Sequence, residues 1–253
     1  MENIKNRPLK KRIYSLTAKN ILKARRERER KINGLSGAEF DLTPFKMPYK
    51  LHFGPGTNWK KPDNHWINID INPKWADLTV DLNNFKNLPL PDNSVDCIYA
   101  SHVFEHINIF SVELVFSECA RVLKPAGVLR VVLPDVVKSI KEYLQGNTEY
   151  SLFQLRRSRG ISLWGKKEYT LFDCLKEDFI SRNTQPELLH SKQLVHQNAW
   201  DFETLRTDLS EAGFRHVYQS GYQLSEFPVF NFEGTYKSAA SQFERSLYAE
   251  AIK

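Results

Sequence analysis

The stretch "LHFGPGTNWKK", residues 51–61, decides how the chain around it folds, because a short apolar run stops abruptly at two glycines. Gly54 and Gly56 flank Pro55, so the run ends in a bend that lacks side chains at two positions. Glycine adopts backbone conformations that other residues avoid, and it lets another molecule approach the backbone closely. The pattern therefore predicts a strand followed by a turn that holds a ligand.

Outward from this turn, strand-like and helix-like patterns alternate from about residue 48 onward. The segment 127–134 is rich in Val and Leu, which is typical of a strand covered on both faces. Strands that alternate with helices predict a mostly parallel sheet. The expected strands span residues 49–54, 65–71, 76–82, 94–101, 127–134, 214–220 and 245–252.

Three helices are expected between these strands. One has an apolar face from Val112 to Leu123 at helical spacing, and Pro125 and Gly127 would end it. Two more would each begin after a capping aspartate and end at a glycine. These boundaries are Asp135 and Gly146 for one helix, and Asp201 and Gly213 for the other. The predicted fold class is α/β: a Rossmann-like, doubly wound, mostly parallel seven-stranded sheet with helices on both faces.

Charge and composition suggest how the chain is divided. Residues 1–50 carry 14 Lys and Arg against 5 Asp and Glu, a net charge of +9, so the remainder carries −3 of the total +6. We expect a basic N-terminal arm or helix over residues 1–47, which could touch an anionic surface. Residues 48–253 would form one domain. Within it, residues 147–195 break the strand–helix rhythm, and we expect an insertion over the active site.

Cysteine usage and hydropathy exclude several protein classes. Cys97, Cys119 and Cys174 are dispersed and odd in number, which argues against a disulfide framework or a zinc ribbon. No apolar run approaches the roughly 20 residues that span a bilayer. The basic N-terminus lacks the apolar segment of a secretory signal. The expected location is cytoplasmic.

Three kinds of ligand use a glycine turn of this kind. A phosphate-binding loop would end in Gly-Lys-Ser/Thr, and this turn does not. A nicotinamide-dinucleotide turn would carry a third glycine where the chain has Trp59. An S-adenosylmethionine site needs fewer glycines, because the turn faces an amino acid and a nucleoside instead of a pyrophosphate. Of the three, this last ligand fits best.

Two aspartates at strand ends support a nucleoside ligand. Asp70 ends the second expected strand, and its carboxylate could accept hydrogen bonds from both hydroxyls of a ribose. Asp81 ends the third and could accept a hydrogen bond from the adenine amino group. Either aspartate alone is more often a turn residue, but the two in this order favour a cofactor site.

The segments "LHFGPG", "INIDI", "LPLPDNSVDCIYASHVFEH" and "RVLKPAG" together resemble the class I S-adenosylmethionine-dependent methyltransferases of the type 11 group. The resemblance covers about residues 49–145. Asn58 stands where many relatives have a third glycine, and the 14 positions from Gly56 to Asp70 leave room only for a short or irregular first helix.

The resemblance implies a cofactor site for S-adenosyl-L-methionine. The turn would face the methionine part, Asp70 would hold the ribose, and Asp81 would lie near adenine. His102 would line the pocket after the fourth strand. The full set of implied cofactor-binding residues is Phe53, Gly54, Pro55, Gly56, Asp70, Ile71, Asp81, Leu82, Ser101 and His102.

The motif "SHVFEH" contains His102, Glu105 and His106, a His-x-x-Glu-His pattern that inverted zinc proteases share. On a helix, the two histidines would share a face and could bind zinc. The motif directly follows a buried-looking strand, and the methyltransferase resemblance explains its place without a metal. Some quinone O-methyltransferases of this fold use Glu-x-x-Glu-His here for a divalent ion, but His102 replaces the first Glu. No metal is therefore predicted.

Methyl transfer from a sulfonium needs mainly a well-positioned acceptor, and a hydroxyl acceptor also benefits from a general base. His106, His102 and His196 are the candidate catalytic residues. The sequence lacks the Asn/Asp-Pro-Pro-Tyr/Phe stretch of amino-methylating nucleic-acid enzymes, and it lacks a Pro-Cys pair. Enzymes that resemble this architecture often modify sugars or other small metabolites, so the resemblance implies O-methylation of a glycan precursor or small molecule. Trp164, Tyr169, Phe172 and Trp200 could stack on its rings or simply pack.

Three alternatives remain open at the level of the sequence. An RNA methyltransferase could dock through the basic N-terminal arm. A degenerate methyltransferase fold could act as a binding protein. A zinc hydrolase would use the His-x-x-Glu-His motif.

Overall fold

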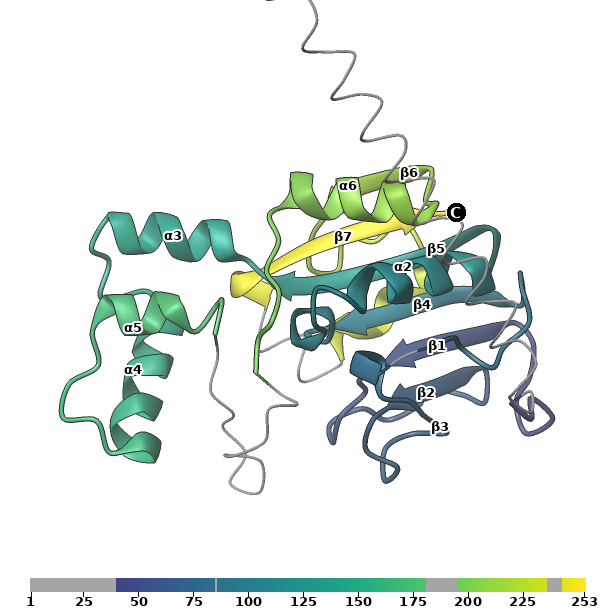
Figure 1. The fold of residues 1–253 in the computed structure, drawn as a ribbon, viewed down its shortest axis with the longest axis horizontal. Coiled ribbons are helices and arrows are strands. Elements are labelled where there is room, and N and C mark those ends of the chain that lie inside the picture. The colour runs from purple at the N-terminus through teal and green to yellow at the C-terminus, as the bar shows by residue number, and fades with distance from the viewer. Residues whose placement is uncertain (1–39, 85, 181–194, 236–242) are drawn as a thin grey trace, which may run out of the picture.

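Seven strands form one sheet in the computed structural model, which describes residues 40–84, 86–180, 195–235 and 243–253 (Figure 1). The strand order is β3-β2-β1-β4-β5-β7-β6. Strands β1 to β5 pair in parallel, and β7 is antiparallel to both β5 and β6. The strands are β1 (Tyr49–Phe53), β2 (Trp66–Asp70), β3 (Leu78–Thr79), β4 (Val95–Ser101), β5 (Leu123–Pro134), β6 (His216–Ser220) and β7 (Ser246–Ile252). The predicted mostly parallel, seven-stranded sheet is confirmed.

Two strands differ in length from the sequence prediction. The third was expected over residues 76–82, but β3 pairs with β2 only at Leu78 and Thr79. The fifth was expected from Gly127, but β5 already begins at Leu123, which pairs with β4 across an irregularity in the register. A Cβ on Gly127 would lie 2.9 Å from the carbonyl oxygen of Lys124, so glycine is needed inside this irregular turn.

The main core lies on the sheet face that α2 (Val112–Val122) and α6 (Phe202–Ala212) cover, where the two helices pack side by side (Figure 1). The predicted apolar face of α2 is buried, and its helix ends at Val122. Helix α6 begins where Asp201 accepts a hydrogen bond from the backbone of Thr204, as its capping role predicts. Each large apolar side chain buried here contributes about 1.5–3 kcal/mol.

The opposite face is covered by the 3-10 helix η6 (Pro228–Gly234) and by aromatic side chains, among them Trp59. Arg130 of β5 is fully buried here between two carboxylates. Its guanidinium donates to Glu233 of η6 at 2.7 Å and to Glu250 of β7 at 2.6 Å. Because a buried charge is tolerated only when it is paired, this network fixes η6 on the sheet.

Three further helices lie beyond the carboxyl ends of β4 and β5, at the left of Figure 1. They are α3 (Val136–Leu144), α4 (Ser151–Trp164) and α5 (Leu171–Lys176). They enclose a small core of their own around Phe153 and Tyr169. Arg156 of α4 is buried against Asp178, with 2.5 Å between Nη2 and Oδ1. The helical group therefore has an apolar and an ionic centre separate from those of the sheet.

Helix α3 is capped by Asp135, as predicted, but its expected apolar stripe is largely uncovered. Leu144 is 76% exposed, while Val136 is buried. Residues 181–194 of the expected insertion and residues 1–39 of the expected basic arm lie outside the described residues. None of the described helices has the length and apolar character needed to cross a membrane.

Candidate functional site

The glycine turn after β1 has the left-handed backbone that its sequence indicates, with φ of +59° at Gly54 and +61° at Gly56. The two glycines have different roles in the turn. A Cβ on Gly54 would lie 2.4 Å from Cγ2 of Val103, so Gly54 lets the loop after β4 pack against the turn. A Cβ on Gly56 would meet nothing within 4 Å, so the backbone at Gly56 is open to a ligand.

Asp70, the last residue of β2, lies against this turn. Its Oδ1 accepts a hydrogen bond of 2.8 Å from the backbone of Asn72, and the backbone N–H of Gly56 also donates to the carboxylate. Burial raises the pKa of Asp70, and these backbone donors oppose the rise. The structure thus brings the turn and the carboxylate of the neighbouring strand together, as the sequence predicts.

No helix forms in residues 54–65, all of which the structure describes, so β1 and β2 are joined by turns alone. Trp59 in this connection packs at 5.5 Å from the ring of Trp66 and donates from Nε1 to Asn68. The expected short or irregular first helix is therefore replaced by a turn that an aromatic side chain holds to the sheet.

Asp81 and Leu82 follow β3 by two and three residues, because that strand ends at Thr79. Oδ1 of Asp81 accepts from the backbone of Asn83 at 2.9 Å, which closes the turn before η2 (Leu82–Asn84). The side chain of Asn83 in turn donates to the backbone carbonyl of His106 at 3.1 Å. The loop after β3 is therefore fastened to the loop after β4.

Ser101 ends β4, and His102 follows it with φ of +53°, a conformation that few residues other than glycine adopt. Its ring is engaged at both nitrogens. Nδ1 lies 3.2 Å from Oε1 of Glu105, and Nε2 lies 2.9 Å from Oγ of Ser246 on β7. A strained backbone with a doubly engaged side chain is common at functional sites.

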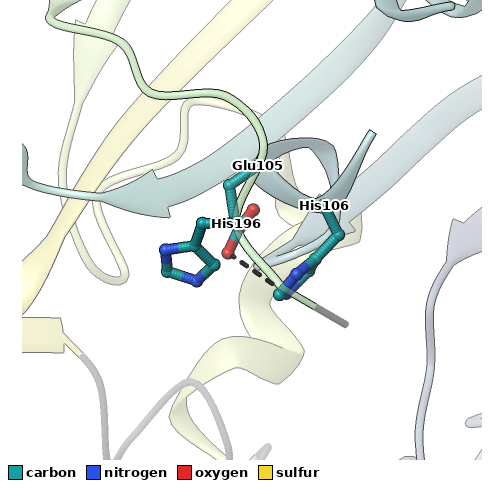
Figure 2. A group of neighbouring side chains, drawn as sticks. All are labelled: Glu105, His106 and His196. Atoms are coloured by element: carbon teal, nitrogen blue, oxygen red, sulfur yellow. Dashed lines mark ion pairs between the residues drawn. The ribbon is translucent and has the colours of Figure 1, made fainter. Parts of the chain in front are cut away.

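Glu105 lies in the 3-10 helix η3 (Phe104–His106) with only 1% of its side chain exposed. His102 precedes η3 and does not share a helical face with His106, in contrast to the zinc-protease arrangement that the motif suggests. Instead, the two histidines flank the carboxylate of Glu105. Nε2 of His106 lies 3.9 Å from Oε1, the pair marked in Figure 2.

His196 joins this group from a segment ninety residues further along the chain. Its ring lies 4.9 Å from that of His106, and Figure 2 shows His106 reaching toward the carboxylate of Glu105 with His196 beside it. The backbone N–H groups of Gln197 and Asn198 donate to the carbonyl oxygen of Glu105 at 2.7 and 3.1 Å. These bonds hold His196 beside η3, a proximity that no sequence pattern reveals.

The electrostatics of this histidine–carboxylate cluster (His102, Glu105, His106 and His196) favour an ionised Glu105. Burial raises the pKa of Glu105, but the close contact with His102 and the two neighbouring histidines outweigh burial and bring that pKa to about 2. Burial lowers the pKa of His196, because a charged imidazole would lose hydration there. The cluster thus sets a buried carboxylate anion beside three imidazole rings.

The four aromatic residues considered for acceptor stacking do not share one surface. Trp200 is buried in the main core and donates from Nε1 to Asp208, whereas Tyr169 is buried in the small helical core. Phe172 is exposed and touches Tyr143. Most of these side chains pack in cores, so they form no common stacking platform.

Residues 55–131 match the family model described as a methyltransferase domain. No curated protein matches the chain. Among solved structures, the chain is similar to an S-adenosylmethionine-dependent methyltransferase from Archaeoglobus fulgidus, at 17% identity over 93% of this chain and 94% of that one, with a TM-score of 0.42. It is also similar to such an enzyme from Mesorhizobium loti, at 15% identity over 81% and 90% of the two chains, with a TM-score of 0.39.

Proposed function

We propose that this chain, a class I S-adenosylmethionine-dependent methyltransferase, transfers the methyl group to a hydroxyl of a glycan precursor or small molecule. The family match and the seven-stranded sheet support the enzyme class and, with it, the cofactor. The acceptor and the residues that bind and activate it are the proposed part.

In this proposal the cofactor lies along the carboxyl ends of β1, β2 and β4, where open sheets of this type bind ligands. Phe53 to Gly56 pass under the methionine part, and Asp70 with Ile71 receives the ribose. Asp81 and Leu82 border the adenine, and Ser101 and His102 close the site after β4. The contact of Gly56 with Asp70 supports the arrangement, because one ligand can then touch both.

The observation that carries O-methylation is the histidine–carboxylate cluster beside the cofactor turn. Val103 packs on Gly54, so the loop that bears Glu105 directly adjoins the turn. In the reaction, an oxygen lone pair of the acceptor forms the new C–O bond while the C–S bond of the sulfonium breaks. The hydroxyl proton must leave, and the cluster offers groups that promote its loss. Because both ring nitrogens of His102 are engaged, we assign proton removal from the acceptor to His106 and His196.

The helical group of α3, α4 and α5 bounds this end of the sheet (Figure 1). We propose that residues 48–253 act as one methyltransferase domain in which residues 147–195 border the acceptor. A glycan or small molecule fits this arrangement better than a nucleobase, because the sequence lacks the motifs of base-methylating enzymes.

The test is transfer of a labelled methyl group from S-adenosylmethionine into fractionated cell extract by the full chain, followed by identification of the labelled compound. We expect a methyl ether, and His106→Gln should lower the rate at least tenfold relative to His216→Gln, a surface histidine on β6. Label on nitrogen or carbon would refute O-methylation. Labelled RNA, with binding that weakens steeply with salt and is lost without residues 1–33, would favour the RNA alternative.

A further inference from the structure

We propose that Glu105, His106 and His196 bind a divalent metal cation of the zinc class. One carboxylate oxygen and one nitrogen from each imidazole lie within 4.8 Å of one another. Figure 2 shows the three side chains close together, two from η3 and one from the segment at residue 196. Around zinc, with bonds of about 2.0–2.1 Å, tetrahedral donors lie about 3.3 Å apart. Side-chain rotations that close the gap by about 1.5 Å would complete the site.

The buried polar atoms of the cluster point to a missing partner. Both carboxylate oxygens of Glu105 and Nδ1 of His106 are buried without a hydrogen-bond partner among the described residues. Oε1 has only the ion-pair contacts with His102 and His106, at 3.2 and 3.9 Å. Buried polar atoms are nearly always satisfied, so a carboxylate held this way indicates an occupant with positive charge.

The outer contacts of the cluster orient its donor atoms as metal sites require. Nδ1 of His196 lies 2.9 Å from the carbonyl oxygen of Asp178, and a carbonyl can only accept, so Nδ1 carries the proton. The lone pair of His196 is then on Nε2. Metal-binding histidines usually donate from one ring nitrogen to a backbone carbonyl or carboxylate and bind the metal through the other. His102, held by Ser246, supports Glu105 from the other side.

The donor set decides the class of cation. Two imidazoles and one carboxylate suit zinc, manganese or iron, whereas magnesium prefers oxygen donors and retained waters. Three protein ligands leave positions open, as in catalytic zinc sites. The sequence predicted no metal because His102 stands where a first glutamate would be expected, but the structure supplies the third donor from His196.

The proposed cation would affect methyl transfer by activating the acceptor hydroxyl, and only this role rests on the proposed function. If the acceptor hydroxyl enters an open position, the cation lowers the pKa of that hydroxyl and promotes loss of its proton. Binding of the cation itself does not depend on which acceptor the enzyme methylates.

The experiment measures metal binding to the full chain after removal of metal with a chelator. Titration calorimetry with Zn²⁺ should give one site per chain, and Mg²⁺ should bind at least tenfold more weakly. Glu105→Gln and His196→Gln should each weaken Zn²⁺ binding at least tenfold. His216→Gln, which removes an exposed histidine elsewhere, should leave the affinity within twofold of the wild type.

Co²⁺ provides a second measurement, because its visible absorption reports nitrogen and oxygen ligands directly. Zn²⁺ should also raise the Tm of the wild type but not that of the Glu105→Gln, His196→Gln double variant, which also shows whether that variant folds. The inference is overturned if Zn²⁺ does not bind, or if the folded double variant binds it as tightly as the wild type. Transfer of methyl to oxygen without metal would then leave the proposed function intact. If Zn²⁺ binds specifically but the label is found on nitrogen or carbon, O-methylation is refuted and the metal site is not.

Discussion

Acidification should destabilise this protein in part through His52, a buried histidine on the strand that leads into the glycine turn. His52 of β1 is fully buried, with its ring 4.3 Å from that of Trp59 and 5.2 Å from that of Tyr99. Burial lowers the pKa of His52 from 6.5 to about 3, because the charged imidazolium would lose its hydration. The native protein therefore keeps His52 neutral at pH values where the unfolded chain takes up a proton.

The sign and size of the change in unfolding free energy follow from the difference in the pKa of His52 between the native and unfolded states. Above pH 6.5 neither state binds the proton, and His52 does not make stability depend on pH. As pH falls from 6.5 toward 3, only the unfolded state is protonated, so the free energy of unfolding decreases. At pH 5 the loss is about 1.5 pH units at 1.36 kcal/mol each, or about 2 kcal/mol.

Urea unfolding at pH 7.5 and pH 5.0 measures this loss in the wild type, in His52→Phe and in His216→Gln. Phenylalanine suits a site among aromatic rings but cannot be protonated. The decrease in unfolding free energy between the two pH values should be about 2 kcal/mol smaller in His52→Phe than in the wild type. His216→Gln should behave like the wild type in this respect. An equal decrease in His52→Phe and wild type would show that His52 is not the acid-sensitive group.

Other expectations can be checked with single variants. Asp70→Asn should weaken S-adenosylmethionine binding in calorimetry about 10- to 100-fold, since hydrogen bonds to a charged group contribute about 1.5–3 kcal/mol, while Asp63→Asn should change it less than twofold. Gly54→Ala should lower the free energy of unfolding by about 2–4 kcal/mol, from the clash with Val103 and the left-handed backbone, and adding Val103→Ala should restore part of it. Arg130→Met should cost about 3–5 kcal/mol in urea unfolding, because it leaves buried carboxylates unpaired; a cost below 1 kcal/mol would contradict that account.

The elements that the sequence predicts well are those set by local chemistry. Asp135 and Asp201 start helices as their capping side chains indicate. The strands at residues 95–101 and 246–252 follow from their apolar residues, and both lie in the interior of the sheet. These patterns depend on a few neighbouring residues, so the elements can be predicted without knowledge of the rest of the fold.

The candidate site could be predicted only in part, because its remaining contacts join distant segments. The approach of Asp70 to the glycine turn follows from the order of parallel strands. The partner of Gly54, by contrast, is Val103, and nothing in the sequence distinguishes this internal contact from contact with a ligand. His196 was a candidate by residue type alone, and its position beside Glu105 depends on backbone hydrogen bonds that follow a long connection.

The bond between His196 and Asp178 has a consequence for how the chain can vary. This hydrogen bond, with 2.9 Å between ring nitrogen and carbonyl oxygen, holds together the two ends of the connection from residue 179 to residue 195. When a loop is closed at its base, doubling its length costs only about 0.6 kcal/mol of closure entropy. A change in the length of that connection should therefore cost little free energy of unfolding, as long as the bond between His196 and Asp178 is kept.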